Sequence, residues 1–558
     1  MLIAGRWNVS RWMVVGNPAL KWVGYNQLVS NEIPINENRQ IARAAGTVMA
    51  AFIFSNLISL LRSIIITNAF GTSADLDAFN AASRVTELLF NLVAGGALAS
   101  AFIPTFTSFL ARDDRPGAWR LASAVINLVL LVLVAVSLLA AVFAPQLVEH
   151  GLYLLAPGTI VTQQQLTTDL LRIMLSSVVI FGVSGLIMGI LNSHQIFLIP
   201  AIAPAMYSLG MIVGTIFLAP KMGISGLAWG VVLGAVGHLL IQIPRLVRIT
   251  GRKFSLSLGI GNPAVAEVLR LMGPRLLGVA VVQLNFIVNT IIALGLPEGS
   301  VSALVFAFGL MMMPQMAIAQ STAIAALPTF STQAAQGRLT ELRESLTATM
   351  RVVILLSVPA SLGLILLRQP LVAFLYQRGE FSERSTSLVA WALAWYAAGL
   401  VGHSLLEVIS RAFYAMQDTR TPVTVGVIAM SLNIGLSFGF SMLFDQIGWA
   451  PHGGLALANS LATALEVTTL MIILRRRLGT LGGNMLVSAA TQSGAGALGM
   501  TVILVVWNYY MNSRAASLNA IGGVLLGTVI YAVVLIVLRV PEVGQLGAIL
   551  KQRFHRPG

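Results

Sequence analysis

Five ionisable residues lie close together near the start of an otherwise apolar chain: Arg62, Asp75, Asp77, Arg84 and Glu87. Arg84 and Glu87 are three residues apart, which places them on one face of a helix where they can pair. A planar guanidinium matches the geometry of phosphate and carboxylate oxygens and binds them through paired hydrogen bonds. The set therefore predicts either a polar cavity that binds an anionic group, or ion pairs that lock two helices together.

A second polar set, Gln283, Asn285 and Asn289, lies within one apolar stretch. The two asparagines are four residues apart, so they share one face of a helix. Two interpretations remain open: these amides line the same cavity, or they form hydrogen bonds between helices.

Other polar groups occur singly or in pairs within apolar stretches, namely His238, Glu466, and the pair His403 and Glu407. A proton-coupling role and hydrogen bonding inside a helical bundle are both open for them. The six histidines show no metal-ligand spacing, there is no cysteine, and no glycine-rich phosphate loop follows a strand. We therefore predict no catalytic activity and no cofactor, and leave open an ion of unknown identity that drives the protein.

The composition shows which elements must hold these residues. Of 558 residues, 57% are hydrophobic and 10% are charged, whereas soluble domains carry roughly 25% charged residues. The apolar residues come in runs of about 20, the length that crosses roughly 30 Å of hydrocarbon as a helix. We predict an all-α integral membrane protein embedded in a phospholipid bilayer. The net charge of +14 comes from basic residues in short loops, so we exclude nucleic acid as a partner.

About 14 transmembrane helices are expected. The predicted spans cover residues 44–61, 78–109, 121–145, 173–191, 196–220, 224–244, 276–296, 301–328, 352–367, 388–410, 422–444, 453–474, 485–511 and 518–538. With both termini in the cytoplasm, 26 of the 34 Lys and Arg residues lie on the inner side. Basic loops stay on the cytoplasmic side of a membrane. The charge pattern thus predicts a multi-pass protein of the bacterial cytoplasmic (inner) membrane with both termini inside.

An internal repeat is visible in the sequence. Residues 101–108 (AFIPTFTS) are echoed by residues 325–332 (AALPTFST) at an offset of 224, and the turn ending at Pro200 is echoed by the turn ending at Pro422 at an offset of 222. Both pairs are six spans apart, which predicts two parallel, pseudo-symmetric six-helix lobes, with the substrate path between them.

The predicted organisation has five parts. They are a cytoplasmic N-terminal tail (1–43), an N-lobe with spans 1–6 (44–250), a C-lobe with spans 7–12 (251–477), two C-terminal helices (478–540) and a cytoplasmic tail (541–558).

From about residue 44 to 540 the chain resembles the MurJ/MviN family of lipid II flippases, which is part of the multidrug/oligosaccharidyl-lipid/polysaccharide exporter superfamily. The matching positions follow one another in the family's order along the predicted spans. They are Ser55, Arg62, 70–71, 77–79, Arg84, 96–97, 101–104, 190–192, 199–201, 203–204, 272–274, 277–279, Gln283, 289–290, 327–328, 378–381, 413–414, 417–418 and 421–422.

The resemblance implies a V-shaped central cavity between two lobes, with the two C-terminal helices forming a groove for a lipid tail. It implies alternating access that carries an undecaprenyl-pyrophosphate-linked glycan, lipid II, from the inner to the outer leaflet for peptidoglycan synthesis. Cavity cations would hold the pyrophosphate, and a membrane potential or ion gradient would drive the cycle. The resulting candidate substrate-binding residues are Ser55, Asn56, Arg62, Asp77, Arg84, Glu87, Gln283, Asn285 and Asn289.

The chain departs from the family where cavity charges are expected. Uncharged residues replace the family's charged ones at Asn56, Ser63, Phe90, Asn91, Gly95, Phe308, Gly309 and Met312. A pyrophosphate in a low-dielectric cavity needs compensating charge, and Arg62 and Arg84 are the cations that remain. Two alternatives to lipid II transport follow: a flippase for another polyprenyl-pyrophosphate-linked oligosaccharide, or a non-transporting relative that scaffolds other cell-wall synthesis proteins.

Overall fold

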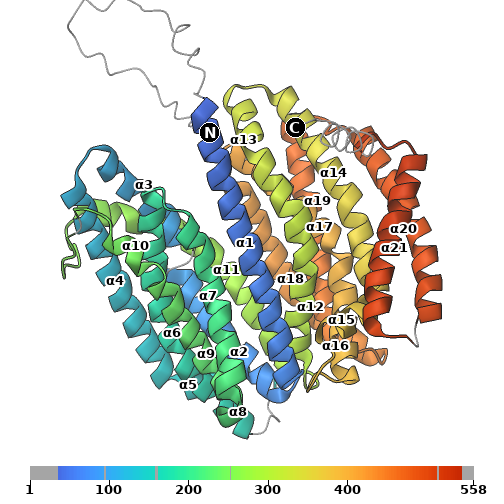
Figure 1. The fold of residues 1–558 in the computed structure, drawn as a ribbon, viewed down its shortest axis with the longest axis horizontal. Helices are drawn as coiled ribbons and strands as arrows, with labels where there is room; N and C mark the ends of the chain where they lie inside the picture. Colours follow the sequence, from blue (N-terminus) through green and yellow to red (C-terminus); the bar gives the residue numbers. More distant parts are fainter. Residues whose placement is uncertain (1–34, 94–95, 157–160, 252, 512–513, 543–558) are drawn as a thin grey trace, which may run out of the picture.

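The computed structural model describes residues 35–93, 96–156, 161–251, 253–511 and 514–542. All regular secondary structure in these ranges is helical (Figure 1). Backbone N–H and C=O groups have no water to bond in the bilayer core, and a helix pairs them within one segment. The predicted all-α membrane fold is confirmed; the predicted tails 1–43 and 541–558 fall largely outside the described residues.

The N-terminal half forms the group of helices on the left of Figure 1, with α1 running between the two groups. Its elements are α1 (Ile35–Phe70), α2 (Ala74–Val93), α3 (Gly96–Ala111), α4 (Arg115–Val142), α5 (Ala144–Leu147), α6 (Val161–Ser193), α7 (Leu198–Val213), α8 (Ala219–Met222), α9 (Ile224–Leu240) and α10 (Ile243–Val247), with π-helical turns at Val148–Leu152 and Gly214–Leu218. We call this group the N-lobe.

The C-lobe and the last two helices comprise α11 (Pro263–Leu294), α12 (Ser300–Gln315), α13 (Ser321–Ala335), α14 (Leu339–Leu366), α15 (Arg368–Tyr376), α16 (Glu383–Ala398), α17 (Leu400–Ala415), α18 (Arg420–Gln446), α19 (His452–Leu478), α20 (Gly483–Met511) and α21 (Ala516–Val537), with a π-helical turn at Met316–Gln320. They form the group on the right of Figure 1, except α11, which packs on α2 and α3 of the N-lobe as well as on α18. Helices α20 and α21 pack on each other at the outer edge of this group.

Eleven helices in the described ranges are long and apolar enough to cross a membrane, or twelve when α16 and α17, bent by 46°, count as one span. The other two predicted spans correspond to α2 with α3, and to α11, where only shorter apolar stretches qualify. The count of fourteen therefore stays a prediction.

The first helix extends beyond the predicted first span, because α1 covers Ile35–Phe70 and the prediction was 44–61. The eight residues after Arg62 are uncharged and mostly apolar, so the helix continues through them. Arg62 consequently lies within α1 and not just beyond its end.

The backbone carries marks of the predicted repeat. Gln195 and Gln417 both have φ of 60°, an uncommon value for a residue with a side chain, and they are 222 residues apart. Asp113 and Gly337, which follow α3 and α13, also share positive φ and are 224 residues apart. These offsets equal those of the sequence echoes, which supports a duplicated six-helix unit.

Glycines bring α7 and α9 into close contact inside the N-lobe. A Cβ placed on Gly210 would lie 2.2 Å from the backbone nitrogen of Gly234, and one on Gly214 would lie 2.5 Å from the Cα of Gly230. The four-residue spacing of small residues is typical of helix pairs that pack backbone to backbone in membranes. The contact fixes α7, on which α1 packs.

Candidate functional site between the lobes

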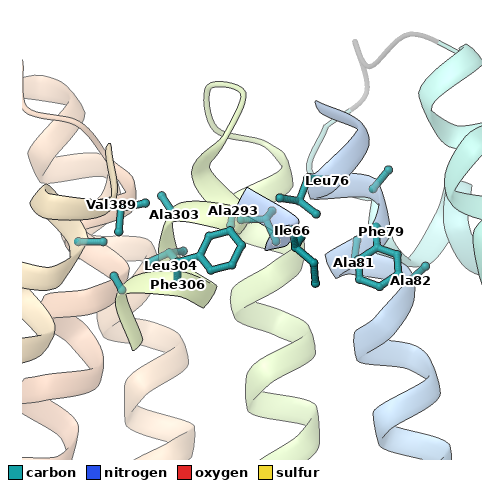
Figure 2. Close-up of a cluster of buried hydrophobic side chains, with 14 of the residues drawn as sticks. Ile66, Leu76, Phe79, Ala81, Ala82, Ala293, Ala303, Leu304, Phe306 and Val389 are labelled. Atoms are coloured by element: carbon teal, nitrogen blue, oxygen red, sulfur yellow. The ribbon is translucent and has the colours of Figure 1, made fainter. Parts of the chain in front are cut away.

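The two lobes share one hydrophobic core at the end where α2 and α12 begin, which we name the joined end. Figure 2 shows part of this core: Leu76 and Phe79 of α2 lie in one layer with Ala293 of α11, Phe306 of α12 and Val389 of α16. All five are buried. Within a bilayer, close packing of this kind is a principal force that holds helices together.

At the opposite end, which we name the split end, the lobes have separate cores. The N-lobe core there contains Phe102, Phe106 and Trp119, and the C-lobe core contains Phe330 and Phe413. The first turns of α11 pack with the N-lobe core, although the predicted boundary at residue 250 assigns this helix to the C-lobe. Beside the N-lobe core, a cavity of about 500 Å³ opens between α3, α6 and α7.

Asp77 links the lobes at the joined end. It lies in the first turn of α2, is buried, and accepts hydrogen bonds from the backbone nitrogens of Gly299 (2.8 Å) and Ser302 (2.7 Å) and from the Ser302 hydroxyl (2.6 Å). These nitrogens belong to the start of α12, where backbone donors and the helix dipole favour an anion. Asp77, a predicted cavity residue, is therefore a cap on the helix of the other lobe.

Glu298 makes the reciprocal contact. Its Oε1 atom accepts a hydrogen bond from the backbone nitrogen of Ala74 at the start of α2 (2.9 Å), and its carbonyl accepts one from Arg384. In a two-fold interface each half contributes the same kind of contact to the other. The starts of α2 and α12 thus meet at the axis of the repeat, and each receives a carboxylate from the opposite lobe.

Two loops also meet closely at the joined end. The Glu380 nitrogen donates a hydrogen bond to the Asn68 carbonyl (3.0 Å). Gly71 and Gly379 both have positive φ, and a Cβ on either would lie 2.4 Å from a carbonyl oxygen of the opposite loop. The contact between the loops therefore requires glycine at both positions.

Arg62 of α1 carries a charge that is not neutralised. Among the described residues it has no carboxylate partner; its contacts are the Met211 sulfur at 3.9 Å and the face of the Tyr207 ring at 5.9 Å, both on α7. It is partly exposed. A guanidinium within a span that lacks an ion-pair partner can bind an anion from outside the protein.

Arg84 of α2 lies deeper between the lobes. Its guanidinium pairs with Glu87 (2.8 Å) and lies 5.2 Å from the centre of the Phe286 ring on α11. It lines a cavity of about 40 Å³ together with Asn289, Phe308 and other residues of α11, α12 and α16. The predicted pair of Arg84 with Glu87 is present, and it leaves the arginine facing the space between the lobes.

Arg62 and the Arg84–Glu87 pair are the charged groups of the candidate site. Arg62 lies 5.9 Å from the centre of the Tyr207 ring on α7, and Arg84 lines the small cavity together with Tyr396 of the C-lobe. A substrate with two negative charges can pair with cations from α1 and α2.

The asparagines of α11 belong to a hydrogen-bonded cluster with α18. Asn285 donates to the Asn433 side chain (2.8 Å) and to the Met430 carbonyl (3.0 Å), while Asn289 donates to Asn433 (3.0 Å) and accepts from Ser437 (2.8 Å). This arrangement matches the interpretation of bonds between helices. Asn289 also lines the small cavity, so for this residue both interpretations apply.

The remaining predicted residues lie elsewhere. Ser55 is buried, and its hydroxyl donates to the Ala201 carbonyl of α7 (3.2 Å), which is a packing contact. Asn56 is exposed on α1 and Gln283 is partly exposed on α11. Substrate binding by these three stays a prediction.

Phe308, a position where the resemblance predicts a charged residue, is the centre of an aromatic cluster. Phe308 packs against Phe286 (6.2 Å between ring centres), Tyr396 (5.2 Å) and His403 (6.2 Å). This aromatic wall lies on the C-lobe side of the small cavity. Within the described ranges, no three His, Asp or Glu side chains gather closely enough to hold a metal ion.

Glu298 and Ser302 were missed by the sequence analysis. The signal that points to them is the repeat offset: Glu298 lies 224 residues after Ala74, and Ser302 lies 225 after Asp77. Residues that meet across a repeat axis are separated by about the length of the repeat, so the offset predicts such pairs.

The chain matches the family model described as "Lipid II flippase MurJ" over residues 66–538. It is similar to the lipid II flippase MurJ of Burkholderia cenocepacia, with 31% identity over 78% of this chain and 84% of the relative. It is also similar to the probable lipid II flippase MurJ of Vibrio cholerae, with 27% identity over 91% of this chain and 98% of the relative.

Two solved structures share the fold. A lipid II flippase MurJ in an inward closed conformation aligns with a TM-score of 0.73 and 24% identity, over 88% of this chain and 98% of that one. An inward-facing multidrug resistance transporter of the MATE family aligns with a TM-score of 0.64 and 15% identity, over 76% and 95%. Together with the membrane-spanning helices and the family model, these findings identify the chain as a multi-pass bacterial inner-membrane protein that belongs to the lipid II flippase MurJ family.

Proposed function

We propose that this protein is a transporter that flips lipid II, the undecaprenyl-pyrophosphate-linked precursor of peptidoglycan, from the inner to the outer leaflet of the cytoplasmic membrane. Support comes from the family model, which covers most of the chain, and from the relatives named lipid II flippase. The transport step needs no catalytic residue and no cofactor; its energy comes from an ion gradient or the membrane potential.

Both termini lie in the cytoplasm in this proposal, because the loops at the split end carry most of the basic residues. The α3–α4 and α13–α14 turns, with Arg112, Arg115 and Arg338, are at that end. The split end then faces inward, and the joined end closes the path to the outside.

The observation that carries the proposal is the arginine pair between the lobes. Arg62 has no carboxylate partner among the described residues, and Arg84 is only partly neutralised by Glu87. Pyrophosphate oxygens bind guanidinium groups through paired, charge-assisted hydrogen bonds. Arg62 supplies the first contact from α1, and Arg84 supplies the second from the floor of the site.

Alternating access follows from the two ends. Lipid II enters at the split end, and its head group binds the arginines. The joined end then separates, which requires Asp77 to leave the start of α12, while the lobes approach each other at the split end. Bound lipid shifts this equilibrium by the difference between its affinities for the two arrangements of the lobes.

A second candidate is transport of a different polyprenyl-pyrophosphate-linked oligosaccharide. The wall formed by Phe286, Phe308 and Tyr396 favours it. Aromatic rings pack on the apolar faces of sugar rings, which charged side chains do not. The non-transporting scaffold of cell-wall synthesis proteins remains the third; it predicts that the arginines are dispensable.

Complementation tests the proposal. The chain is expressed in bacteria whose own lipid II flippase can be shut off, and both growth and the arrival of lipid II in the outer leaflet are measured. We expect rescue by the unmodified chain, loss of rescue with Arg62→Ala, and rescue by the control Arg172→Ala, which removes an exposed cation on α6. Failure by the unmodified, correctly inserted chain would contradict lipid II as substrate.

A further inference from the structure

A stripe of polar side chains runs through the interior of the C-lobe, apart from the arginine site. On α17 it consists of His403, Glu407 and Arg411, four residues apart and therefore on one helix face. On the facing side of α19 it consists of Asn459, Thr463 and Glu466, at spacings of four and three. The two helices pack against each other.

Contacts within the stripe leave one member without a partner. His403 Nε2 is 3.0 Å from Asn459 Oδ1 and 3.4 Å from the Thr463 hydroxyl, and Glu407 pairs with Arg411 (2.6 Å). Glu466, by contrast, forms no hydrogen bond or ion pair among the described residues.

Glu466 is only 7% exposed, and its Oε2 atom is buried with no hydrogen-bond partner. The residue facing it from α18 is Gly426, where a Cβ would lie 3.1 Å from Oε1. The titratable and charged groups on the neighbouring face of α17 are His403, Glu407 and Arg411, and the Arg411 guanidinium lies 5.9 Å from the centre of the Tyr414 ring. An ionised carboxylate is costly in such surroundings, whereas a neutral carboxyl group is tolerated.

We propose that Glu466 binds and releases a proton during the transport cycle, and that its protonated form stabilises the arrangement of lobes described above. The reaction is the addition of one proton from the aqueous phase to the carboxylate and its later return to water, with no other bond made or broken. The inference rests on the proposed transport function and identifies the ion that is coupled to it.

A proton fits the stripe better than a metal ion. The guanidinium of Arg411 lies in the same stripe and repels other cations, and Asn459 Oδ1 already faces His403. When Glu466 loses its proton, its buried Oε2 atom has no hydrogen-bond donor among the described residues, so the ionised form favours a rearrangement of the helices around it.

The stripe is placed to couple this change to lobe movement. At one end, His403 contacts Phe308, which lines the small cavity beside Arg84. At the other end, α17 packs on α13 and on the π-helical turn Met316–Gln320, which lead to the split end. A shift of α17 therefore reaches both the floor of the substrate site and the split end.

Two measurements on the full chain in lipid nanodiscs test the inference. The first is infrared difference spectroscopy over a pH titration, which detects the C=O stretch of a buried protonated carboxyl group. We expect a band in the unmodified chain that is absent in Glu466→Gln and unchanged in the control Glu344→Gln, an exposed residue of α14. This readout needs no lipid substrate, so it stands even if the proposed function fails.

The second measurement is the distance across the split end. The chain has no cysteine, so spin labels can be attached at Ser108→Cys and Thr332→Cys, equivalent exposed positions of α3 and α13. The distance distribution should change with pH in the unmodified background and stay at its low-pH form at every pH in Glu466→Gln. A pH response that survives Glu466→Gln, or a response to Na⁺ at constant pH in place of protons, would overturn the inference. Glu466→Asp, which keeps a titratable group, should retain the pH response that Glu466→Gln loses.

Discussion

The joined end and the split end are built from the same repeated helices, yet only one of them holds the lobes together. At the joined end, α2 and α12 meet at their starts, and each exchanges a carboxylate cap with the other. At the split end, α3 and α13 have their aromatic residues in separate cores. Closure of an end therefore depends on a few polar contacts at helix starts, added to a packed apolar layer.

The two caps are unequal. Asp77 is buried and accepts three hydrogen bonds, whereas Glu298 accepts one from Ala74 at the exposed edge of the contact. Charged hydrogen bonds gain strength where water is excluded. Asp77 should therefore carry most of the electrostatic stabilisation of the joined end, with Glu298 as a minor contributor.

Removing the Asp77 cap should open the joined end more than any other single change. In Asp77→Ala the buried donors of Gly299 and Ser302 lose their acceptor, at a cost of about 3 kcal/mol, or roughly 100-fold in the ratio of joined to separated molecules. Spin-label distances across the joined end measure that ratio. Asp77→Asn keeps an acceptor oxygen, so its ratio of joined to separated molecules should lie between those of the unmodified chain and Asp77→Ala. An unchanged distance distribution in Asp77→Ala would show that the cap does not hold the joined end closed.

Gly71→Ala should open the joined end by a different route. The added Cβ would lie 2.4 Å from the Glu380 carbonyl oxygen, and overpacking of this kind costs about 1–3 kcal/mol. Gly448→Ala is a matched control, because Gly448 also has positive φ but nothing lies within 4 Å of its Cβ position. Both variants place alanine at a positive φ, so they share the backbone strain. If Gly71→Ala and Gly448→Ala give equal distances across the joined end, the contact with the Glu380 carbonyl oxygen is not the cause of opening.

Glu298→Gln should have a smaller effect on the same distance. The glutamine keeps an acceptor for the Ala74 nitrogen and loses the charge at the start of α2, which is worth about 0.3–1 kcal/mol at an exposed helix start. High salt should reduce the difference between Glu298→Gln and the unmodified chain. A loss as large as that of Asp77→Ala would show that the caps are equivalent.

The smallest effect concerns the C-lobe turn at the split end. The Thr421 hydroxyl and backbone N–H, with the Arg477 guanidinium, lower the pKa of Asp418 to about 2. A carboxyl group with a lowered pKa stabilises the folded chain at pH values above its unfolded pKa, and this stabilisation is lost as pH falls through about 2. Asp418→Asn should lower thermal stability slightly at pH 7, by about 1 kcal/mol or less. The difference in thermal stability between Asp418→Asn and the unmodified chain should shrink below pH 4. A difference that stays constant with pH would contradict a lowered pKa of Asp418.

Much of the fold was predictable because apolar runs, proline turns and the repeat offset are local or periodic signals. The helical class and the pair of Arg84 with Glu87 both follow from them. The position of Arg62 within its helix was misjudged, since no charge or proline marks the end of α1 before Phe70.

The partners of the site residues were less accessible to sequence reasoning. Asp77 looked like a cavity residue, because nothing near it in the sequence indicates that the start of α12 lies beside it. Asn433 and Ser437, which bind the asparagines of α11, lie almost 150 residues away. Such contacts depend on how lobes pack, and spacing along one helix does not encode them.

The two ends of the molecule should open alternately as lipid II moves. Spin-label pairs at both ends, Ser108→Cys with Thr332→Cys and Glu149→Cys with Glu383→Cys, measure both distances in lipid nanodiscs before and after lipid II is added; all four sites are exposed. We expect the split-end distance to shorten while the joined-end distance lengthens, and Arg62→Ala to suppress both changes. Distances that change in the same direction at both ends, or that do not respond to lipid II, would contradict alternating access.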